Sequence, residues 1–351
     1  AGFLLFASQA NGQPVCDALS PVWLSDAAVA GALMLVLSRL TLDSWKARFG
    51  AAVAAGAMLV GFHVVAWPNC LQRLEGVSPE AEALWLDHVR EAKPIYGHKW
   101  RTAVTALALP VTALLGWTLL IWRARIDREL VARTSAVARP WVAALALLFW
   151  QTGAGPAAQM MALPAATSIV VLVAAPWFRA PQKWKHVVAI LVAVVGFGAA
   201  VPVVLRLIPP EKTGPAQRRV LTANRSCASI ARLAPVDALP KGTIFTFVDL
   251  GPRLIVTTRH NAIAGPYHRN DRAIVDVMKA FRGSEAEAHR IVSEYRSDYL
   301  LICPDMATAT IFMAEAPKGF YAQLARGKVP AWLTPIEAPN GSPFKIWKVT
   351  G

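Results

Sequence analysis

The sequence predicts an α-helical polytopic membrane domain, followed by a small α/β domain outside the cytoplasm. Three observations support this fold class: six apolar stretches of about bilayer length, basic residues concentrated on alternate connections, and a change to mixed, charge-rich composition at Pro209-Pro210. Because a helix rises about 1.5 Å per residue, about 20 apolar residues cross the hydrocarbon core. We therefore assign residues 1–208 to the transmembrane domain and residues 209–351 to the α/β domain.

The six predicted spans differ in length. The first and fourth are short, and they need neighbouring helices or local thinning of the bilayer. The apolar segment that begins at Ala1 lacks the features of a signal peptide, and we expect it to be the outer end of a further span in an N-terminally truncated chain. The predicted spans cover residues 26–40, 50–67, 102–122, 140–153, 157–177 and 187–208.

Lysine and arginine mark one side of the predicted membrane domain. The connections 39–50, 123–139 and 179–186 together carry eleven Lys or Arg and three acidic residues, whereas the opposite connections carry five basic residues over a longer stretch. By the positive-inside bias, the basic set is cytoplasmic and the α/β domain is not. Much of the net charge of +14 therefore reports topology, which argues against nucleic acid as a partner.

All four cysteines fall on segments that this topology places outside the cytoplasm. Disulfides persist in oxidising compartments and are rare in the cytosol. We predict that Cys16 pairs with Cys70 and that Cys227 pairs with Cys303, although four cysteines permit three sets of pairings. The alternative is four buried free thiols.

Strands and helices alternate in the segment after Pro210. Short β-rich runs flanked by turn residues predict strands at 244–248 and 299–303, and residues 345–349 alternate in polarity. One helical stripe follows the first strand, and a capping box opens a second helix. This alternation predicts a small α/β sandwich. The first helical stripe contains Ile274, Val275, Met278 and Phe281. Ser284 with Glu287 forms the capping box of the second helix, whose apolar face contains Ala288, Ile291, Val292 and Tyr295.

Residues 78–92 predict an external amphipathic helix that lies on the membrane surface. Ser78 is a suitable cap, Pro79 suits the first helical position, and apolar side chains recur on one face. The opposite face is acidic and carries Asp87 and Glu91, which are further candidates for substrate contact. The alternative is a helix that only packs beneath the α/β domain.

The densest functional signal lies between Asp249 and Asn270. A predicted strand ends at Asp249, a second apolar run covers 254–256, and a helix is predicted to start after Asn270. Free N–H groups and the dipole at a helix N-terminus favour an anion, and Arg and His side chains suit phosphate. We therefore predict a site for a phosphate or pyrophosphate head group, formed by Arg259, His260, Tyr267, His268, Arg269 and Asn270.

A structural interpretation of the same cluster remains open. Asn270 would be a helix N-cap, Arg269 would pair with Asp249, and Tyr267 would fill the corner between sheet and helix. Neither histidine in the cluster has the spacing of a metal-ligand set. The chain also contains no zinc motif, P-loop, dinucleotide-binding fingerprint, serine nucleophile elbow or catalytic carboxylate pair. We therefore predict no metal site.

Ionisable residues are nearly absent from the predicted spans. A transporter coupled to protons or ions would retain buried acids or bases and is typically built from inverted repeats of its spans. We find no such repeat in the sequence. His63 is the notable polar group, and such a histidine is more often an interhelical hydrogen-bonding residue than a proton relay. These observations weigh against transport.

Six short segments from Cys70 onwards carry a resemblance. They are Cys70-Leu71, Pro79-Glu80, Leu84-Trp-Leu-Asp-His-Val-Arg-Glu-Ala92, Asp249-Leu-Gly-Pro252, Tyr267-His-Arg-Asn270 and Ser297-Asp-Tyr-Leu-Leu-Ile-Cys-Pro304. Together they resemble a group of uncharacterised alphaproteobacterial multi-span membrane proteins. That group is similar in layout to the C-type membrane glycosyltransferases, which use polyprenyl-phosphate sugars and often carry an α/β domain outside the cytoplasm.

The resemblance implies sugar transfer from a polyprenyl-phosphate donor to an envelope acceptor, on the periplasmic side of a bacterial inner membrane. A carboxylate base would activate the acceptor hydroxyl, while basic side chains, with or without a divalent cation, would stabilise the departing lipid phosphate. In that family the catalytic acid lies in the first external loop. That region would precede Ala1, so no residue of this chain is matched to it. The implied partners are membrane lipids and the lipid-linked sugar.

A second hypothesis is a non-catalytic membrane protein whose periplasmic domain binds a partner or an envelope polysaccharide. It predicts that the polar cluster is satisfied by hydrogen bonds within the domain. The enzyme hypothesis instead predicts a pocket lined by the 267–270 loop and the 78–92 helix.

Overall fold

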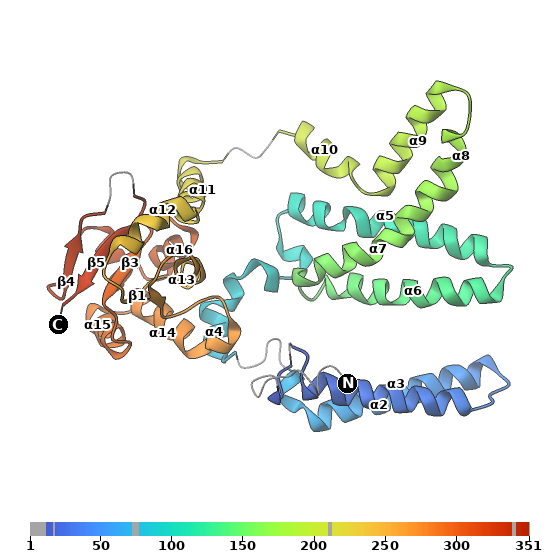
Figure 1. Ribbon diagram of the computed structural model, residues 1–351, viewed down its shortest axis with the longest axis horizontal. Coiled ribbons are helices and arrows are strands. Elements are labelled where there is room, and N and C mark those ends of the chain that lie inside the picture. The colour runs from blue at the N-terminus through green and yellow to red at the C-terminus, as the bar shows by residue number, and fades with distance from the viewer. Residues whose placement is uncertain (1–11, 17, 72–76, 210–212, 339–341, 351) are drawn as a thin grey trace. The chain divides into compact units, whose positions relative to one another are not determined.

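The computed structural model describes residues 12–16, 18–71, 77–209, 213–338 and 342–350. The chain is mostly helical, with a small mixed sheet near the C-terminus (Figure 1). It divides into two compact units, of which the first contains residues 1–82 and 219–351 and the second contains residues 83–218. The expected end of a further span at Ala1 lies outside the described residues.

The first unit begins with a helical hairpin of α2 (Pro21–Arg39) and α3 (Trp45–Ala66). Both helices are long and apolar enough to cross a membrane, as predicted. Each begins five residues before the predicted span, because Ser20 and Ser44 act as N-caps whose hydroxyls accept backbone hydrogen bonds from Val22 and Ala47. Almost all of the hairpin's apolar surface is exposed, as expected for helices covered by lipid.

In the second unit, α5 (Trp100–Ala124) packs closely against α7 (Gly155–Ile169). Gly116 lies directly against the carbonyl of Ala165, where no Cβ would fit. In lipid, the hydrophobic effect does not drive helices together, so membrane helices associate by close packing, which small residues allow. Trp117, which follows Gly116 on α5, packs against Trp141 of the next helix with ring centroids 6.3 Å apart.

The fourth predicted span was placed too late in the chain. Helix α6 covers Arg128–Leu147 rather than residues 140–153, and much of the connection predicted at 123–139 is helical. The helix starts early because the Asp127 carboxylate accepts hydrogen bonds from the backbone N–H groups of Glu129 and Leu130. Pro140 therefore lies inside the helix instead of near its start.

The fifth predicted span is confirmed as one apolar helical stretch over residues 152–178. Its first turn is η6 (Thr152–Ala154), and α7 continues into a π-helical turn, η7 (Val170–Ala174), before α8 (Ala175–Phe178).

The last predicted span is broken. Instead of one helix over residues 187–208, α9 (Lys183–Gly196) and α10 (Ala200–Leu207) meet at an angle of 89°. Gly198 lies at the break with a φ of +67°, a left-handed conformation that favours glycine. A Cβ at this position would lie 2.8 Å from the backbone nitrogen of Leu109, so the break packs directly on α5.

Arg101, in the first turn of α5, binds the end of α10. Its guanidinium donates hydrogen bonds to the carbonyls of Leu205 (3.0 Å), Ile208 (3.0 Å) and Pro209 (2.7 Å). The last carbonyls of a helix have no partner within the helix, so the arginine satisfies groups that would otherwise be costly in apolar surroundings. The end of α10 is thereby fixed at the N-terminal end of α5.

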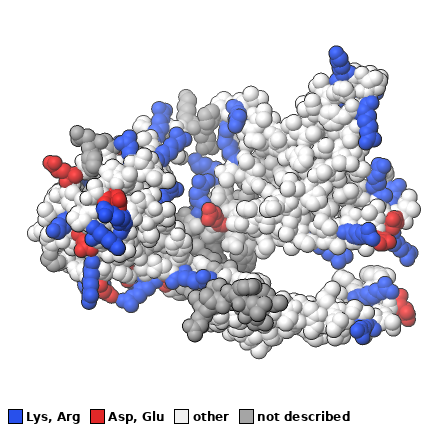
Figure 2. All heavy atoms as spheres, in the orientation of Figure 1, with Lys and Arg blue, Asp and Glu red and all other residues white. Residues whose placement is uncertain are grey.

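Basic side chains gather at one set of helix ends. In Figure 2, Lys and Arg cluster at the α2–α3 turn of the first unit and at the α5–α6 and α8–α9 turns of the second. In the second unit, these turns lie at the opposite end of α5 from Arg101.

The segment predicted as one helix over 78–92 is interrupted. Helix α4 covers only Pro79–Leu84, and Trp85 then leaves helical geometry with a φ of −131°. Trp85 and Leu86 are both buried although they are adjacent, which one face of a continuous helix does not allow. Short 3₁₀ turns complete this connection: η2 (Pro68–Leu71), η3 (Leu86–His88), η4 (Arg90–Ala92) and η5 (Ile95–Gly97).

In its described residues, the α/β domain contains a five-stranded mixed sheet in the order β2-β1-β3-β5-β4. Strand β1 pairs in parallel with both β2 and β3, whereas β5 pairs antiparallel with β3 and β4. The strands at 299–303 and 345–349 are confirmed, the one at 244–248 is shorter than predicted, and the edge strands β2 and β4 were not predicted. The strands are β1 (Thr243–Phe245), β2 (Asn261–Ala262), β3 (Tyr299–Ile302), β4 (Leu333–Ile336) and β5 (Lys345–Val349).

Aromatic rings form the core between the sheet and its helices. The Phe247 ring packs against Phe281 at 5.0 Å, Phe312 at 5.5 Å and Tyr321 at 5.7 Å. Both predicted helices are confirmed, including the Ser284 cap. The apolar run 254–256 lies on a helix. The helices and turns are α11 (Pro215–Cys227), α12 (Ile230–Leu233), η8 (Ala234–Ala238), α13 (Gly251–Thr257), η9 (His268–Asn270), α14 (Asp271–Arg282), α15 (Glu285–Glu294), α16 (Ala307–Glu315) and α17 (Phe320–Ala325).

The two predicted cysteine pairings are confirmed. The sulfurs of Cys16 and Cys70 lie at disulfide distance across the open end of the α2–α3 hairpin. Cys227 and Cys303 also pair, and both are fully buried in the α/β domain. The second pair connects the end of α11 to the residue after β3.

We predict that Gly198→Ala destabilises the helical unit by about 2 to 4 kcal/mol, because it adds both left-handed strain and a clash with the α5 backbone. Thermal unfolding of the detergent-solubilised protein measures the effect. Gly56→Ala is the matched control, since a Cβ at Gly56 meets nothing within 4 Å. Equal midpoints for both variants would contradict the packing of Gly198 on α5.

Removing the Cys227–Cys303 disulfide is expected to lower the free energy of unfolding of the α/β domain by about 4 kcal/mol, because the pair closes a long loop in the unfolded chain. Chemical denaturation of the Cys227→Ala/Cys303→Ala variant tests this. The Cys16→Ala/Cys70→Ala variant is the control and should leave the domain's transition unchanged.

Candidate functional site

Arg259, a predicted head-group contact, is held by an acid of its own domain. Its backbone N–H donates to Oδ1 of Asp237 (2.6 Å), and its Nη2 donates to the Asp237 carbonyl (3.0 Å). The hydrogen bond from the Arg259 backbone, together with the charge of the guanidinium, lowers the pKa of Asp237 below its usual value. The arginine side chain nevertheless stays 68% exposed, so its remaining donors face solvent.

His260 has the environment of a core histidine. The side chain is only 2% exposed, and its ring packs edge-on against Tyr299. Nε2 lies 3.0 Å from the carbonyl of Val236, and Nδ1 lies 3.2 Å from the backbone nitrogen of Gly242. A neutral ring that donates from Nε2 and accepts at Nδ1 satisfies both contacts. His260 therefore connects η8 to the start of β1.

The 267–270 loop leads into α14, as predicted. Tyr267 is largely exposed and precedes η9, which contains His268, Arg269 and Asn270. Asn270 occupies the N-cap position of α14, but its side chain makes no capping bond and donates instead to the carbonyl of Ile263 (3.3 Å). Asn270 is therefore at the N-cap position that the structural interpretation predicted, without a side-chain capping bond.

The first turn of α14 already carries a carboxylate. Asp271 accepts hydrogen bonds from the backbone N–H (2.9 Å) and the hydroxyl (3.3 Å) of Ser78. Further along α14, Lys279 forms an ion pair with Glu80 at 2.9 Å. The segment before α4 is thus attached to α14 beside the 267–270 loop. The anion site at this loop stays a prediction.

Asp87 and Glu91, the other candidates, belong to the second unit. Both are exposed and lie on the 3₁₀ turns η3 and η4, not on one helical face. The carbonyl of Glu91 accepts a hydrogen bond from the hydroxyl of Thr152, as does the carbonyl of Arg90.

A hollow of about 540 Å³ opens beside the carboxyl end of β3. In α/β folds, ligands bind near the carboxyl ends of parallel strands. Asp249 follows β1 and accepts a hydrogen bond from Thr308 (2.5 Å), which joins the end of β1 to α16. The predicted pairing of Arg269 with Asp249 stays a prediction. Asp305 follows β3 in a left-handed conformation and lines the hollow with Tyr321.

Sequence reasoning missed a polar pair inside the α2–α3 hairpin. His63 lies 2.7 Å from Oδ2 of Asp26, so the expected interhelical hydrogen bond of His63 is confirmed. Both side chains are mostly buried, with 23% of His63 and 14% of Asp26 exposed. The other oxygen of Asp26, Oδ1, is buried and makes no hydrogen bond with any residue that the structure describes.

The end of the hairpin around this pair is cross-linked by hydrogen bonds and a disulfide. The Trp67 indole donates to the hydroxyl of Ser25 (3.0 Å), and the Trp23 indole donates to the carbonyl of Cys16 (2.8 Å). The Cys16–Cys70 disulfide closes the same end. The pair is therefore held by two helices, two indoles and a covalent link.

A carboxylate oriented by an imidazole can act as a general base. His63 fixes one oxygen and leaves Oδ1 with unused acceptor capacity, which is the arrangement needed to remove a proton from a hydroxyl. An ionisable group inside apolar helices is costly and is therefore a functional candidate. The signal in the sequence was the presence of Asp26 and His63 near the same end of two adjacent apolar stretches.

Among the residues described, no group of three or more His, Cys, Asp or Glu side chains is placed to hold a metal ion. The comparisons with protein-family models and with curated proteins find no match to this chain.

We predict that Asp305→Asn lowers the pKa of Tyr321. Burial first, and the Asp305 charge second, raise this pKa to about 12, so removing the charge should leave a smaller elevation. Absorbance titration of the phenolate measures it, with Tyr321→Phe to assign the signal. Because the folded-state pKa exceeds the unfolded value of about 10, the associated stability is present below pH 10 and is lost as the pH rises towards 12.

The control for this titration is Asp276→Asn. Asp276 accepts a hydrogen bond from Tyr295 and not from Tyr321. An unchanged Tyr321 titration in Asp305→Asn would show that the carboxylate does not face the hollow.

Proposed function

We propose that this chain is a membrane glycosyltransferase-like protein, related to the C-type membrane glycosyltransferases. It transfers a sugar from a polyprenyl-phosphate donor to an envelope acceptor on the periplasmic side of a bacterial inner membrane. The observation that carries the proposal is the Asp26–His63 pair, which supplies a carboxylate base inside apolar helices.

Membrane placement is supported by the helices themselves. Among the described residues, five helices are long and apolar enough to cross a membrane, and we count the bent α9–α10 pair, which passes the same test as a unit, as a sixth span. Their outward surfaces carry large exposed apolar side chains, which water would disfavour and lipid accommodates.

The proposed sidedness has independent support in each unit. In the first, the Cys16–Cys70 disulfide closes the end of the hairpin opposite the basic α2–α3 turn. In the second, Arg101 holds the end of α10 at the end of α5 opposite the basic α5–α6 turn. Disulfides favour an oxidising compartment, and basic turns favour the cytoplasm. Both units therefore favour a periplasmic α/β domain.

The proposed reaction moves one proton to Asp26 and releases polyprenyl phosphate as the leaving group. Oδ1 of Asp26 takes the proton of the acceptor hydroxyl while His63 holds Oδ2. The acceptor oxygen bonds to the anomeric carbon as the bond between that carbon and the phosphate oxygen breaks. The polyprenyl phosphate leaves with the electron pair, and Arg269 is our candidate for contact with its charge.

The test is sugar transfer by purified protein in proteoliposomes that contain a labelled polyprenyl-phosphate sugar. Asp26→Asn keeps the shape of the side chain but removes the base, and should lower the rate at least about 100-fold. His63→Ala should lower it less, and Arg269→Ala should lower it through weaker binding of the lipid phosphate.

Glu129→Gln is the control for this assay. Glu129 is an exposed acid that pairs with Arg133 on α6, and its loss should leave transfer unchanged. Full activity of Asp26→Asn would reject Asp26 as the base. If neither wild type nor any variant transfers sugar, and the protein binds an envelope polysaccharide instead, the second candidate function, described next, is favoured.

That second candidate is a non-catalytic membrane protein whose periplasmic domain binds a partner or an envelope polysaccharide. One observation favours it: Arg259, His260 and Asn270 all make hydrogen bonds inside the α/β domain. It predicts that the purified protein binds the partner or polysaccharide without transferring sugar. Asp26→Asn should leave this binding unchanged.

A further inference from the structure

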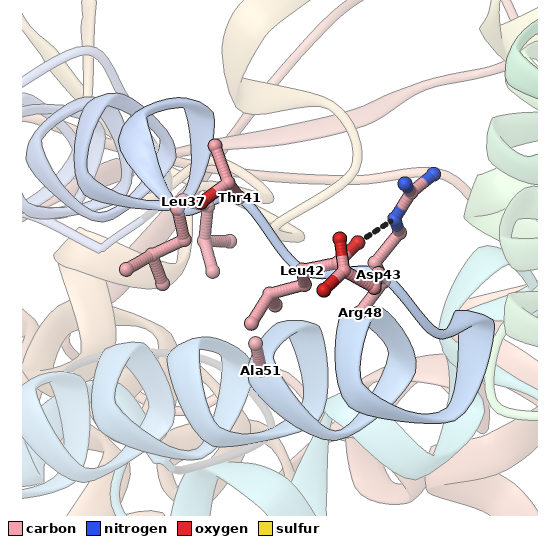
Figure 3. Close-up of a pocket in the computed structure, with 7 residues that line it drawn as sticks. Leu37, Thr41, Leu42, Asp43, Arg48 and Ala51 are labelled. Carbon is pink, nitrogen blue, oxygen red and sulfur yellow. Dashed lines mark hydrogen bonds between the residues drawn. The ribbon is translucent and has the colours of Figure 1, made fainter.

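A hollow of about 470 Å³ lies at the α2–α3 turn. Figure 3 shows that its lining comes from the end of α2, the connection and the first turns of α3, with Leu42 pointing towards Ala51. Leu37, Leu40, Leu42 and Ala51 provide the apolar part of the lining, and Thr41, Asp43 and Arg48 provide the polar part. This volume falls within the range of sites for small ligands.

Two opposite charges line this hollow without neutralising each other. Arg48 donates from Nε to the carbonyl of Leu42 (2.8 Å), which shapes the connection and leaves its two terminal amino groups unused. Neither Asp43 nor Arg48 forms an ion pair with any residue in the described part of the chain. The hollow therefore offers one carboxylate and one guanidinium to a ligand that carries both charges.

The turn also has the features of a membrane–water boundary. Trp45 opens α3 with 72% of its surface exposed, and tryptophan is enriched at the depth of lipid head groups. Arg39 and Lys46 flank the hollow and add positive charge. Exposed apolar side chains of α2 and α3, including Leu35 and Val53, continue from the turn and would contact acyl chains.

We propose that this hollow binds the head group of a zwitterionic amino-phospholipid of the phosphatidylethanolamine type. Arg48 binds the phosphate and Asp43 accepts hydrogen bonds from the primary ammonium, while the leucines and Ala51 contact the glycerol and the first acyl carbons. A choline head group lacks N–H donors for Asp43, and a glycerol head group lacks the positive charge. The inference rests on the membrane placement proposed above, but not on glycosyl transfer.

The experiment measures which lipid the protein retains. Delipidated protein in detergent is incubated with an equimolar mixture of phosphatidylethanolamine, phosphatidylglycerol and phosphatidylcholine, repurified, and analysed by mass spectrometry of the bound lipids. Wild type should be enriched in phosphatidylethanolamine. Asp43→Asn should reduce that enrichment roughly tenfold, the loss expected for one charge-assisted hydrogen bond, and should spare phosphatidylglycerol.

Two further variants separate binding from folding. Arg48→Gln should reduce retention of all three lipids, and Ala51→Phe should do the same by filling the hollow while leaving both charges in place. Glu129→Gln and Arg133→Gln are matched controls, because this exposed pair lies at another basic turn. Both controls should retain the wild-type lipid pattern.

Several outcomes would overturn the proposal. These are an absence of phosphatidylethanolamine preference in wild type, an unchanged preference in Asp43→Asn, or an equal loss in Glu129→Gln. Displacement of the lipid by free phosphoethanolamine at millimolar concentration would identify a site for a soluble ligand instead. Asp26→Asn should lose transfer and keep lipid retention, so failure of the transferase proposal and failure of this one are distinguishable.

Discussion

The capping of α10 by Arg101 is the interaction on which the arrangement of this chain depends. After the 89° break, α10 ends with backbone carbonyls that have no helical partner and that lipid cannot satisfy. The arginine in the first turn of α5 binds those of Leu205, Ile208 and Pro209. The same contact determines where the chain leaves the helical unit, at the end opposite the basic α5–α6 turn. Gly198 makes the break possible, because only a residue without a Cβ can pack its left-handed backbone on α5.

The helical hairpin of the first unit combines two polar features at opposite ends. At the disulfide end, Asp26 and His63 form a buried pair with one unused carboxylate oxygen. At the other end, Asp43 and Arg48 line a hollow without pairing. The unpaired Asp26 oxygen is buried, which costs stability, whereas Asp43 and Arg48 are exposed and can contact a ligand. These are the sites at which we propose base chemistry and lipid recognition, respectively.

Several connections of the α/β domain are held by hydrogen bonds. His260, Asn270 and Asp271 each hold a connection in place, and Cys227–Cys303 links α11 to the sheet. These contacts favour a rigid domain whose exposed groups, such as the Arg259 guanidinium, are presented in fixed positions. Its hollow at the carboxyl end of β3 combines Asp305 with a Tyr321 whose pKa is raised.

The sequence by itself determined the features that depend on local pattern: most of the apolar helices, the Ser284 cap and strands β3 and β5. It favoured the two observed cysteine pairings over the other two sets. These follow from length, alternation and compartment, which neighbouring residues encode. Only the tertiary structure decided the break at Gly198, the interruption at Trp85 and the pairing of Asp26 with His63. Each depends on contact between residues distant in the chain or on which side chains become buried, and hydropathy averaged along the sequence carries no such information.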